Sequence, residues 1–279
     1  MPTVPKEIKE LSRLSKEEWK EYTKTVWSIP NVSDKEHPAV FPVEIPKRLI
    51  KLFSFWGELV YDPFAGIGTT ASAALDLSRR SLSVELSADY SSRIQEIVCD
   101  APSEEHIVAC GDSRSIGWVS DSSVDLIVTS PPYWNKIEYD GPKGGLGDVE
   151  GYRDFFRQIR PSFEECFRVL RPGRKLCVVT ANVNQYTEHG LLTFPLSSDF
   201  TVLLREIGFV MVNELIWSKD RTGGRWGSWG AQRPIFGSYP YPPNFLFKNV
   251  HEYILIFAKP ATKKKSSKKA ASYDALMEL

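Results

Sequence analysis

A glycine-containing turn in the first quarter of the chain combines residue types that could hold a ligand. Residues 62–70, Asp-Pro-Phe-Ala-Gly-Ile-Gly-Thr-Thr, join an apolar strand-like segment to a helix-like one. Glycines permit a tight turn and a close approach to a ligand, and a helix N-terminus presents free N–H groups. With two glycines and no Gly-Lys-Ser/Thr, the run is neither the three-glycine dinucleotide fingerprint nor a phosphate-binding loop. The expected ligand contacts are Asp62, Phe64, Gly66, Gly68, Thr69 and Thr70.

Acidic residues end the next two strand-like segments. Glu85 follows the turn at roughly the 20-residue spacing at which an acid accepts hydrogen bonds from ribose hydroxyls. Asp112, together with Ser113, could meet an adenine amino group, and Asp62 could pair with a cationic group but would repel a phosphate. The three acids therefore fit a nucleoside with a positively charged arm, and S-adenosylmethionine has this composition.

A rigid, acceptor-rich turn follows the fourth strand-like segment. In Ser130-Pro131-Pro132-Tyr133, the prolines fix an extended backbone, lack N–H donors and present carbonyl groups. The Ser130 hydroxyl and Pro131 carbonyl could accept both hydrogens of a planar amino group while Tyr133 stacks on its ring. This geometry would expose the nitrogen lone pair to a methyl sulfonium. By itself the turn fits a structural role equally well, but beside the glycine turn we predict that these four residues are catalytic.

These two motifs resemble those of S-adenosylmethionine-dependent DNA amino-methyltransferases, which modify cytosine N4 or adenine N6. Residues 62–70 are similar to the cofactor motif, although Ile67 stands where such proteins often have Ser, and residues 129–133 are similar to the catalytic motif. Residues 37–42, His-Pro-Ala-Val-Phe-Pro, resemble the segment that packs against the methionine end of the cofactor. The resemblance covers roughly residues 37–259 and adds Phe41 and Pro42 to the expected cofactor contacts.

The order of the motifs differs from that of many family members. In these, the catalytic motif comes first, and a segment like Glu252–Lys259 leads into one like residues 37–42. Here the two segments lie near opposite ends of the chain, and joining the ends would restore the order. The chain therefore resembles a circular permutation, which neighbouring surface termini make feasible.

The resemblance implies that a base is flipped out of duplex DNA, with Tyr133 stacking on it and Trp134 as a wall of the pocket. Ser at the position of Ser130 favours cytosine N4 over adenine N6 in this family. Methylation of RNA or of a protein amide, and a non-catalytic DNA-binding relic, remain the alternatives. A companion restriction endonuclease is implied by family analogy alone.

Short strand-like segments alternate with helices, which predicts an α/β fold with a doubly wound, mostly parallel Rossmann-like methyltransferase sheet. The predicted helices cover residues 14–27, 43–53, 69–77, 88–98, 151–170 and 198–207. The predicted strands cover residues 59–64, 81–86, 106–111, 124–129, 175–180, 210–217 and 253–258.

An irregular stretch over residues 220–250 interrupts this alternation and is rich in Gly, Pro, aromatic residues and Arg. Residues 219–269 contain eleven basic residues against two acidic ones, although the whole chain is formally neutral. We predict that residues 220–250 are an inserted target-recognition region, in which arginines read guanine edges or hold phosphates. The expected DNA contacts are Trp134, Arg221, Arg225, Arg233 and Lys248.

The remaining divisions are an N-terminal helical extension (1–36), a methyltransferase domain (37–219 and 251–260) and a basic, disordered tail (261–279). The 279 residues, 42% of them apolar, suffice for one such domain with an insertion. Without a membrane-length apolar run or a signal peptide, we expect a cytoplasmic protein that contacts no membrane. The four cysteines form no CxxC pair and the histidines are isolated, so we expect no metal; Cys110 and Cys177 are expected in the core.

Overall fold

The computed structural model describes residues 4–32, 41–134, 145–219, 241 and 249–261. In these residues eight strands form one sheet, in the order β1-β9-β10-β6-β5-β2-β3-β4. Five neighbouring strands run parallel: β6 (Leu170–Thr180), β5 (Val124–Thr129), β2 (Leu59–Asp62), β3 (Arg80–Glu85) and β4 (His106–Cys110). The strand β10 (His251–Ala258) is antiparallel to β6 and β9 (Val210–Ser218), and β1 (Val26–Ser28) pairs in parallel with β9.

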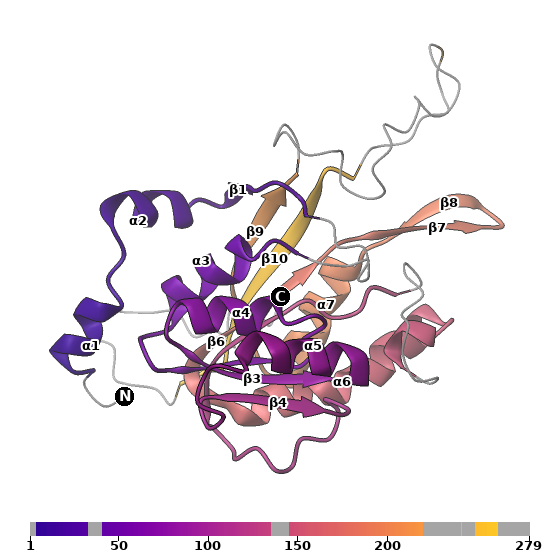
Figure 1. Ribbon diagram of the computed structural model, residues 1–279. Helices are drawn as coiled ribbons and strands as arrows, with labels where there is room; N and C mark the ends of the chain where they lie inside the picture. The colour runs from indigo at the N-terminus through magenta and orange to yellow at the C-terminus, as the bar shows by residue number, and fades with distance from the viewer. Residues whose placement is uncertain (1–3, 33–40, 135–144, 220–240, 242–248, 262–279) are drawn as a thin grey trace.

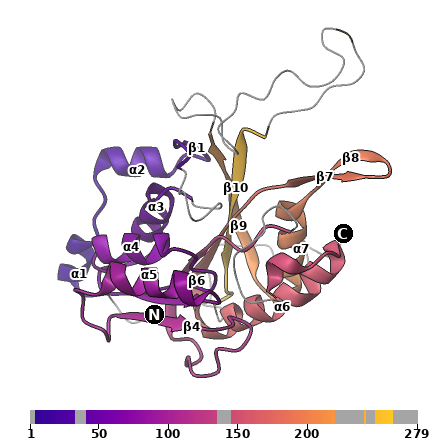
Figure 2. The same cartoon turned by 45° about the vertical axis from the view of Figure 1, so that its right-hand side comes forward.

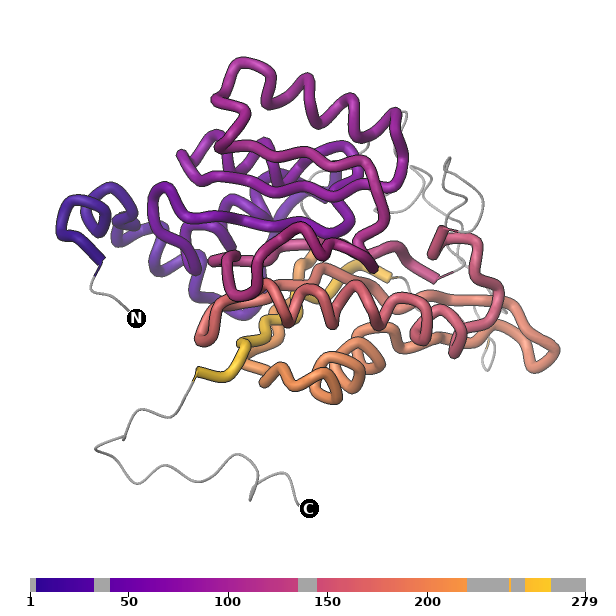
Figure 3. The backbone as a smooth tube through the Cα atoms, turned by 90° about the horizontal axis from the view of Figure 1, so that it is seen from below, coloured from indigo at the N-terminus to yellow at the C-terminus, as the bar shows by residue number. Residues whose placement is uncertain are grey.

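Helices cover both faces of the sheet (Figures 1 and 3). On one face lie α3 (Glu44–Phe53), α4 (Thr69–Asp76) and α5 (Ala88–Val98). On the other face lie α6 (Tyr152–Val169) and α7 (Leu196–Ile207). The predicted doubly wound, mostly parallel α/β fold is confirmed.

Alternation along the central strands produces two hydrophobic cores. In β6, Leu176 and Val178 belong to the cluster beneath α6 and α7, whereas Cys177 and Val179 belong to the cluster beneath α3. Successive side chains of a strand point to opposite faces, so a continuous apolar run is the pattern expected of a sheet covered on both sides.

The helix predicted for residues 14–27 ends earlier in the structure, at Tyr22. Ser15 caps α2 (Lys16–Tyr22) through a capping box with Glu18, but the helix does not continue to Trp27. Trp27 lies in β1, fully buried, and pairs with Trp217 of β9. Burial of a large indole against the sheet outweighs the local helical pattern. The extension predicted for residues 1–36 thus contributes the edge strand of the main sheet.

Other features were absent from the sequence prediction. A short helix, α1 (Lys6–Leu11), precedes α2, and the strands β7 (Val183–Thr187) and β8 (Gly190–Phe194) form a hairpin that projects from the body (Figure 2). Cys177 is buried as predicted, whereas Cys110 is exposed at the end of the edge strand β4. No helix among the described residues has the length and apolar character to cross a membrane. The same residues contain no group of three His, Cys, Asp or Glu placed to hold a metal ion.

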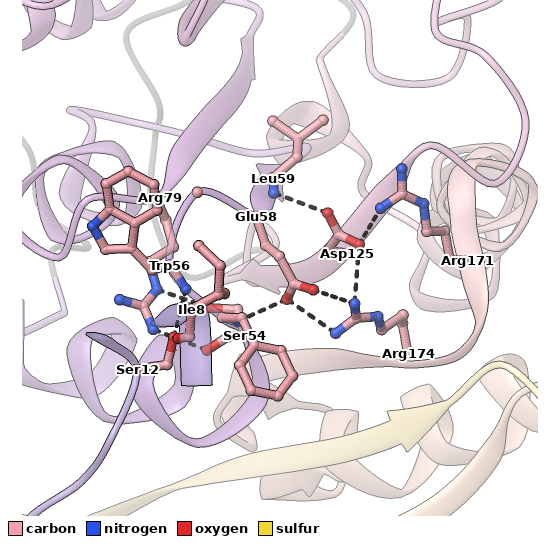
Figure 4. A network of polar contacts seen from close by, with 12 residues as sticks. Ile8, Ser12, Ser54, Trp56, Glu58, Leu59, Arg79, Asp125, Arg171 and Arg174 are labelled. Atoms are coloured by element: carbon pink, nitrogen blue, oxygen red, sulfur yellow. Dashed lines mark hydrogen bonds and ion pairs between the residues drawn. The ribbon is translucent and has the colours of Figure 1, made fainter. Parts of the chain in front are cut away.

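A polar network joins the starting ends of three strands, at the edge opposite their carboxyl ends (Figure 4). The buried Asp125 of β5 accepts a hydrogen bond from Leu59 N of β2 at 3.1 Å and pairs with Arg174 of β6 at 3.3 Å. Arg174 also pairs with Glu58, and Arg171 pairs with Asp125. Because a buried carboxylate is costly unless paired, these contacts have a structural role.

Both ends of the described chain reach this network. Ser12, next to α1, accepts a hydrogen bond from Trp56 N at 2.7 Å, as Figure 4 shows. Lys259, after β10, donates its backbone N–H to Arg174 O at 3.1 Å. A circular permutation requires such neighbouring chain ends.

Candidate active site

One cavity lies where the carboxyl ends of β2, β3, β4 and β5 meet. Residues after each of these strands line it, together with Phe41 from the segment before α3 and residues 145–148. In a doubly wound sheet, ligands bind in this crevice because the turns at the strand ends converge there. The structure brings together these predicted site residues: Phe41, Phe64, Gly66, Thr69, Glu85, Asp112, Ser113, Ser130, Pro131, Pro132 and Tyr133.

Asp62, a predicted cofactor contact, is 1% exposed and is not among the residues that line the cavity. Its oxygens accept hydrogen bonds from Phe64 N at 3.1 Å, Thr70 Oγ1 at 2.7 Å and Thr129 Oγ1 at 2.6 Å. A cationic ligand group therefore finds no open carboxylate here. Asp62 instead fastens the glycine turn to the end of β5, directly before the Ser-Pro-Pro-Tyr loop.

Three further predicted contacts do not line the cavity: Gly68 and Thr70 support the turn, and Pro42 supports the start of α3. Gly68 has φ +89°, and a Cβ there would lie 3.1 Å from side-chain atoms of Ile94 and Ile97. Glycine is therefore required by the backbone conformation and by the packing of α4 on α5. Thr70 is buried against Asp62, and Pro42 O accepts the N–H of Ile45 at the start of α3.

The buried Asp62 carboxyl predicts a pH-dependent stability. Burial raises its pKa from 3.8 to about 6, against the lowering effect of its hydrogen bonds. Between these values the folded chain binds more protons at Asp62 than the unfolded chain, so the free energy of unfolding decreases as the pH rises. We expect this contribution, about 2 kcal/mol between pH 4 and 7, to disappear in Asp62→Asn.

Chemical denaturation of the two proteins at pH 4, 5, 6 and 7 measures this difference. The exposed Asp76 at the end of α4 offers the control substitution Asp76→Asn. Parallel stability curves for the unaltered chain and Asp62→Asn would contradict the prediction.

Glu85 joins two turns at the end of β3. Its Oε2 accepts a hydrogen bond from Gly66 N at 2.7 Å, and its Oε1 accepts one from Ser87 N at 2.9 Å. Burial raises the pKa of the carboxyl, and the two backbone N–H groups oppose the rise. Each carboxylate oxygen has two lone pairs, so Glu85 retains acceptor capacity for a ligand in the cavity.

The pair expected to meet an adenine is partly engaged within the protein. Asp112 accepts hydrogen bonds from Arg114 Nε at 2.8 Å and Nη2 at 2.6 Å, and these contacts lower its pKa. The Ser113 hydroxyl lies 3.0 Å from the Ser162 hydroxyl of α6. Arg114, which also lines the cavity, was missed, although its spacing of two residues from Asp112 allows the ion pair.

The Ser-Pro-Pro-Tyr loop follows β5 and lines the cavity beside the glycine turn, which follows the neighbouring strand β2. Tyr133 is 6% exposed, and its hydroxyl donates a hydrogen bond to Glu252 Oε2 of β10 at 2.9 Å. The other oxygen of Glu252 lies 2.5 Å from Lys219 Nζ. Sequence reasoning missed this pair; the only signal was an acid within the apolar strand segment after His251.

Trp134, predicted to form a wall of the base pocket, is 5% exposed and lies outside the lining of the cavity. Its Nε1 donates to Glu150 O at 3.0 Å, and its ring centroid lies 5.0 Å from that of Tyr152 and 4.6 Å from that of Phe194. Trp134 thus anchors the Ser-Pro-Pro-Tyr loop to α6 and to the β7–β8 hairpin.

Further residues that line the cavity were not predicted. Leu86, Ser87 and Tyr90 follow β3, and Gly145–Asp148 approach from the segment before α6. The predicted DNA contacts Arg221, Arg225, Arg233 and Lys248, and most of the region 220–250, lie outside the described residues. So does the predicted tail, apart from its first residue.

The strand order, the antiparallel β10 and the cavity position define a Rossmann-like α/β fold of the methyltransferase type. The [4+2]-cyclase SpnF has the same fold, with a TM-score of 0.52, 14% identity and coverage of 79% of this chain and 82% of SpnF. The family model described as DNA methylase, of N6 and N4 methyltransferases, matches residues 2–96 and 124–277. The chain therefore belongs to this DNA methylase family.

Individual relatives match part of the chain. The type II methyltransferase M.MjaI of Methanocaldococcus jannaschii is 40% identical over 190 residues, which are 60% of each chain. A candidate DNA modification methylase of Thermus thermophilus, solved with S-adenosyl-L-methionine, is 33% identical over 57% of each chain, with a TM-score of 0.40. The chain thus spans about 60% of the length of these two relatives.

Proposed function

We propose that this protein transfers a methyl group from S-adenosylmethionine to the exocyclic amino group of a base in duplex DNA. The observation that carries the proposal is the convergence of the glycine turn, Glu85 and the Ser-Pro-Pro-Tyr loop on one cavity. Membership of the DNA methylase family and the likeness to the type II methyltransferase M.MjaI support it.

The residues around the cavity fit this cofactor. Glu85 would offer acceptors for ribose hydroxyls, Asp112 would meet the adenine, and Phe41 and Phe64 supply apolar walls. Three acids and one base, Glu85, Asp112, Asp148 and Arg114, line the cavity, which favours a cationic ligand. When bound, the cofactor supplies an electrophilic methyl group.

The catalytic loop then acts on the target amino group. The Ser130 hydroxyl and the Pro131 carbonyl accept its two hydrogens, while Tyr133 stacks on the base. Pro131 and Pro132 carry no N–H, so no backbone donor of these two residues competes for the nitrogen lone pair. The proton released on methylation passes to water, either directly or through the Ser130 hydroxyl, which gives up its own proton as it receives one. Stacking with polar contacts offsets the few kcal/mol that extrusion of the base costs.

Ser130 leads us to propose cytosine N4 as the target, with adenine N6 as the alternative. Arg221, Arg225, Arg233 and Lys248, within the proposed recognition region 220–250, would contact DNA; residues 1–36 would be an extension and 261–279 a basic tail. We further propose a cytoplasmic enzyme that modifies sites also recognised by a restriction endonuclease, by analogy with type II relatives.

Transfer of a labelled methyl group to unmethylated duplex DNA, followed by nucleoside digestion and mass analysis, tests the proposal. N4-methylcytosine is the expected product, and N6-methyladenine would retain the mechanism but change the base. Label in RNA alone would favour an RNA methyltransferase. Cofactor binding without label in any polymer would favour a non-catalytic module.

A further inference from the structure

A buried carboxylate outside both motifs lies directly behind the cavity. Glu252 of β10 is 7% exposed, and its Oε2 accepts the hydrogen bond of the Tyr133 hydroxyl at 2.9 Å. Tyr133 is among the residues that line the cavity, and its hydroxyl is held by a strand distant in sequence. This contact at the far end of the side chain restrains the direction of the ring, which the backbone alone leaves free to turn.

The second oxygen of Glu252 is also engaged. Lys219 Nζ lies 2.5 Å from Oε1 and 4.4 Å from the centroid of the Trp217 ring. The backbone N–H of Lys219 donates to Val250 O at 2.8 Å, so the two residues that flank 220–249 are hydrogen-bonded to each other. A buried carboxylate is costly unless paired, so Lys219 neutralises Glu252 and holds it toward Tyr133.

We infer that Glu252 is a positioning residue for the target base: it holds the Tyr133 ring in the plane that stacks on an extruded base, and Lys219 orients the carboxylate. This inference rests on the proposed function. It assigns Glu252 to the base side of the cavity, since its polar contacts reach the catalytic loop and the end of β9 but not the glycine turn or Glu85. Its loss should therefore lower turnover without weakening cofactor binding.

The variant Tyr133→Phe tests the contact, because it keeps the stacking ring and removes only the hydroxyl. A hydrogen bond to a charged group has a net worth that corresponds to roughly a 10- to 100-fold effect, so we expect kcat on unmethylated duplex DNA to fall by about ten-fold or more. The dissociation constant of S-adenosylmethionine should remain within about two-fold.

Tyr152→Phe is the matched control. Its hydroxyl also donates to a carboxylate, Asp199, but its ring lies outside the cavity lining. We expect Tyr152→Phe to change kcat by less than about two-fold. Equal kcat values for the two variants would overturn the inference.

Two substitutions of Glu252 separate positioning from ion pairing. Glu252→Gln retains an oxygen acceptor for Tyr133, whereas Glu252→Ala does not, and both remove the charge that pairs with Lys219. Positioning requires a higher kcat for Glu252→Gln than for Glu252→Ala, and no further loss when Tyr133→Phe is added to Glu252→Ala. Equal turnover of the two Glu252 variants, or additive losses, would overturn it.

The unaltered chain is assayed alongside. If it transfers no methyl group to DNA, both the proposed function and this inference fail. If it does so and Tyr133→Phe matches its rate, the inference alone fails, and this comparison does not depend on whether the Glu252 variants fold.

Discussion

Ser130→Ala is expected to lower kcat for DNA methylation by roughly 10²- to 10³-fold and to leave cofactor affinity within about three-fold. In the proposed mechanism the Ser130 hydroxyl accepts a hydrogen bond from the target amino group and relays the released proton to water. The loop that carries Ser130 follows β5, whereas the glycine turn and Glu85, which would hold the cofactor, follow β2 and β3. Single-turnover kinetics with labelled cofactor and calorimetric titration measure the two quantities separately.

The exposed Ser92 on α5 provides the control, since its hydroxyl donates only to Ala88 O within the helix. Ser92→Ala should retain both turnover and affinity. A loss of cofactor affinity in Ser130→Ala as large as the loss of turnover would assign Ser130 to cofactor binding instead of catalysis.

The sequence was sufficient to predict the helices and strands whose residue pattern lies within a single segment. The prediction placed α5 and β5 within the bounds found in the structure, because helical periodicity and continuous apolar runs are read within a single segment. The cavity was also predictable in outline. Parallel strands all end at one edge, so Phe64, Glu85, Asp112 and Ser130 had to converge once the strands were assigned.

The direction of a side chain was not predictable in the same way. Asp62 lies at the predicted turn, yet three donors hold it inside the protein, and the sequence does not indicate which way its carboxylate points. Trp134 has the aromatic ring expected of a residue that stacks on a base, but this ring packs against Tyr152 and Phe194, which come from later elements.

Contacts between residues far apart along the chain were also not predictable from the sequence. Tyr133 and Glu252 are 119 residues apart, and β1 is a strand only because β9 lies beside it. A three-residue strand and a lone acid carry no periodicity of their own. Such features depend on the assembled sheet, and in a chain with rearranged motif order the segments that meet cannot be read from their neighbours in sequence.

The same reasoning separates the two acids at the glycine turn. Asp62 and Glu85 each hold backbone or hydroxyl donors of the turn, but only Glu85 also lines the cavity. Substitution of Asp62 should therefore act mainly on stability, whereas substitution of Glu85 should act on the ligand as well.

Glu85→Ala is accordingly expected to weaken the binding of S-adenosylmethionine by at least about 10²-fold. The substitution removes the proposed acceptor for the ribose and leaves Gly66 N and Ser87 N without their acceptor, so the turns that shape the cavity lose their common anchor. Charge-assisted hydrogen bonds are each worth about 1.5–3 kcal/mol, and about 1.4 kcal/mol corresponds to a tenfold change in affinity. Isothermal titration calorimetry measures the effect.

Two further variants serve as controls for this loss of affinity. Glu85→Gln, which keeps one oxygen acceptor, should lose less affinity for S-adenosylmethionine, and the exposed Glu96→Ala on α5 should lose none. Unchanged affinity in Glu85→Ala would place the cofactor elsewhere, because a ligand in this cavity could not avoid the end of β3.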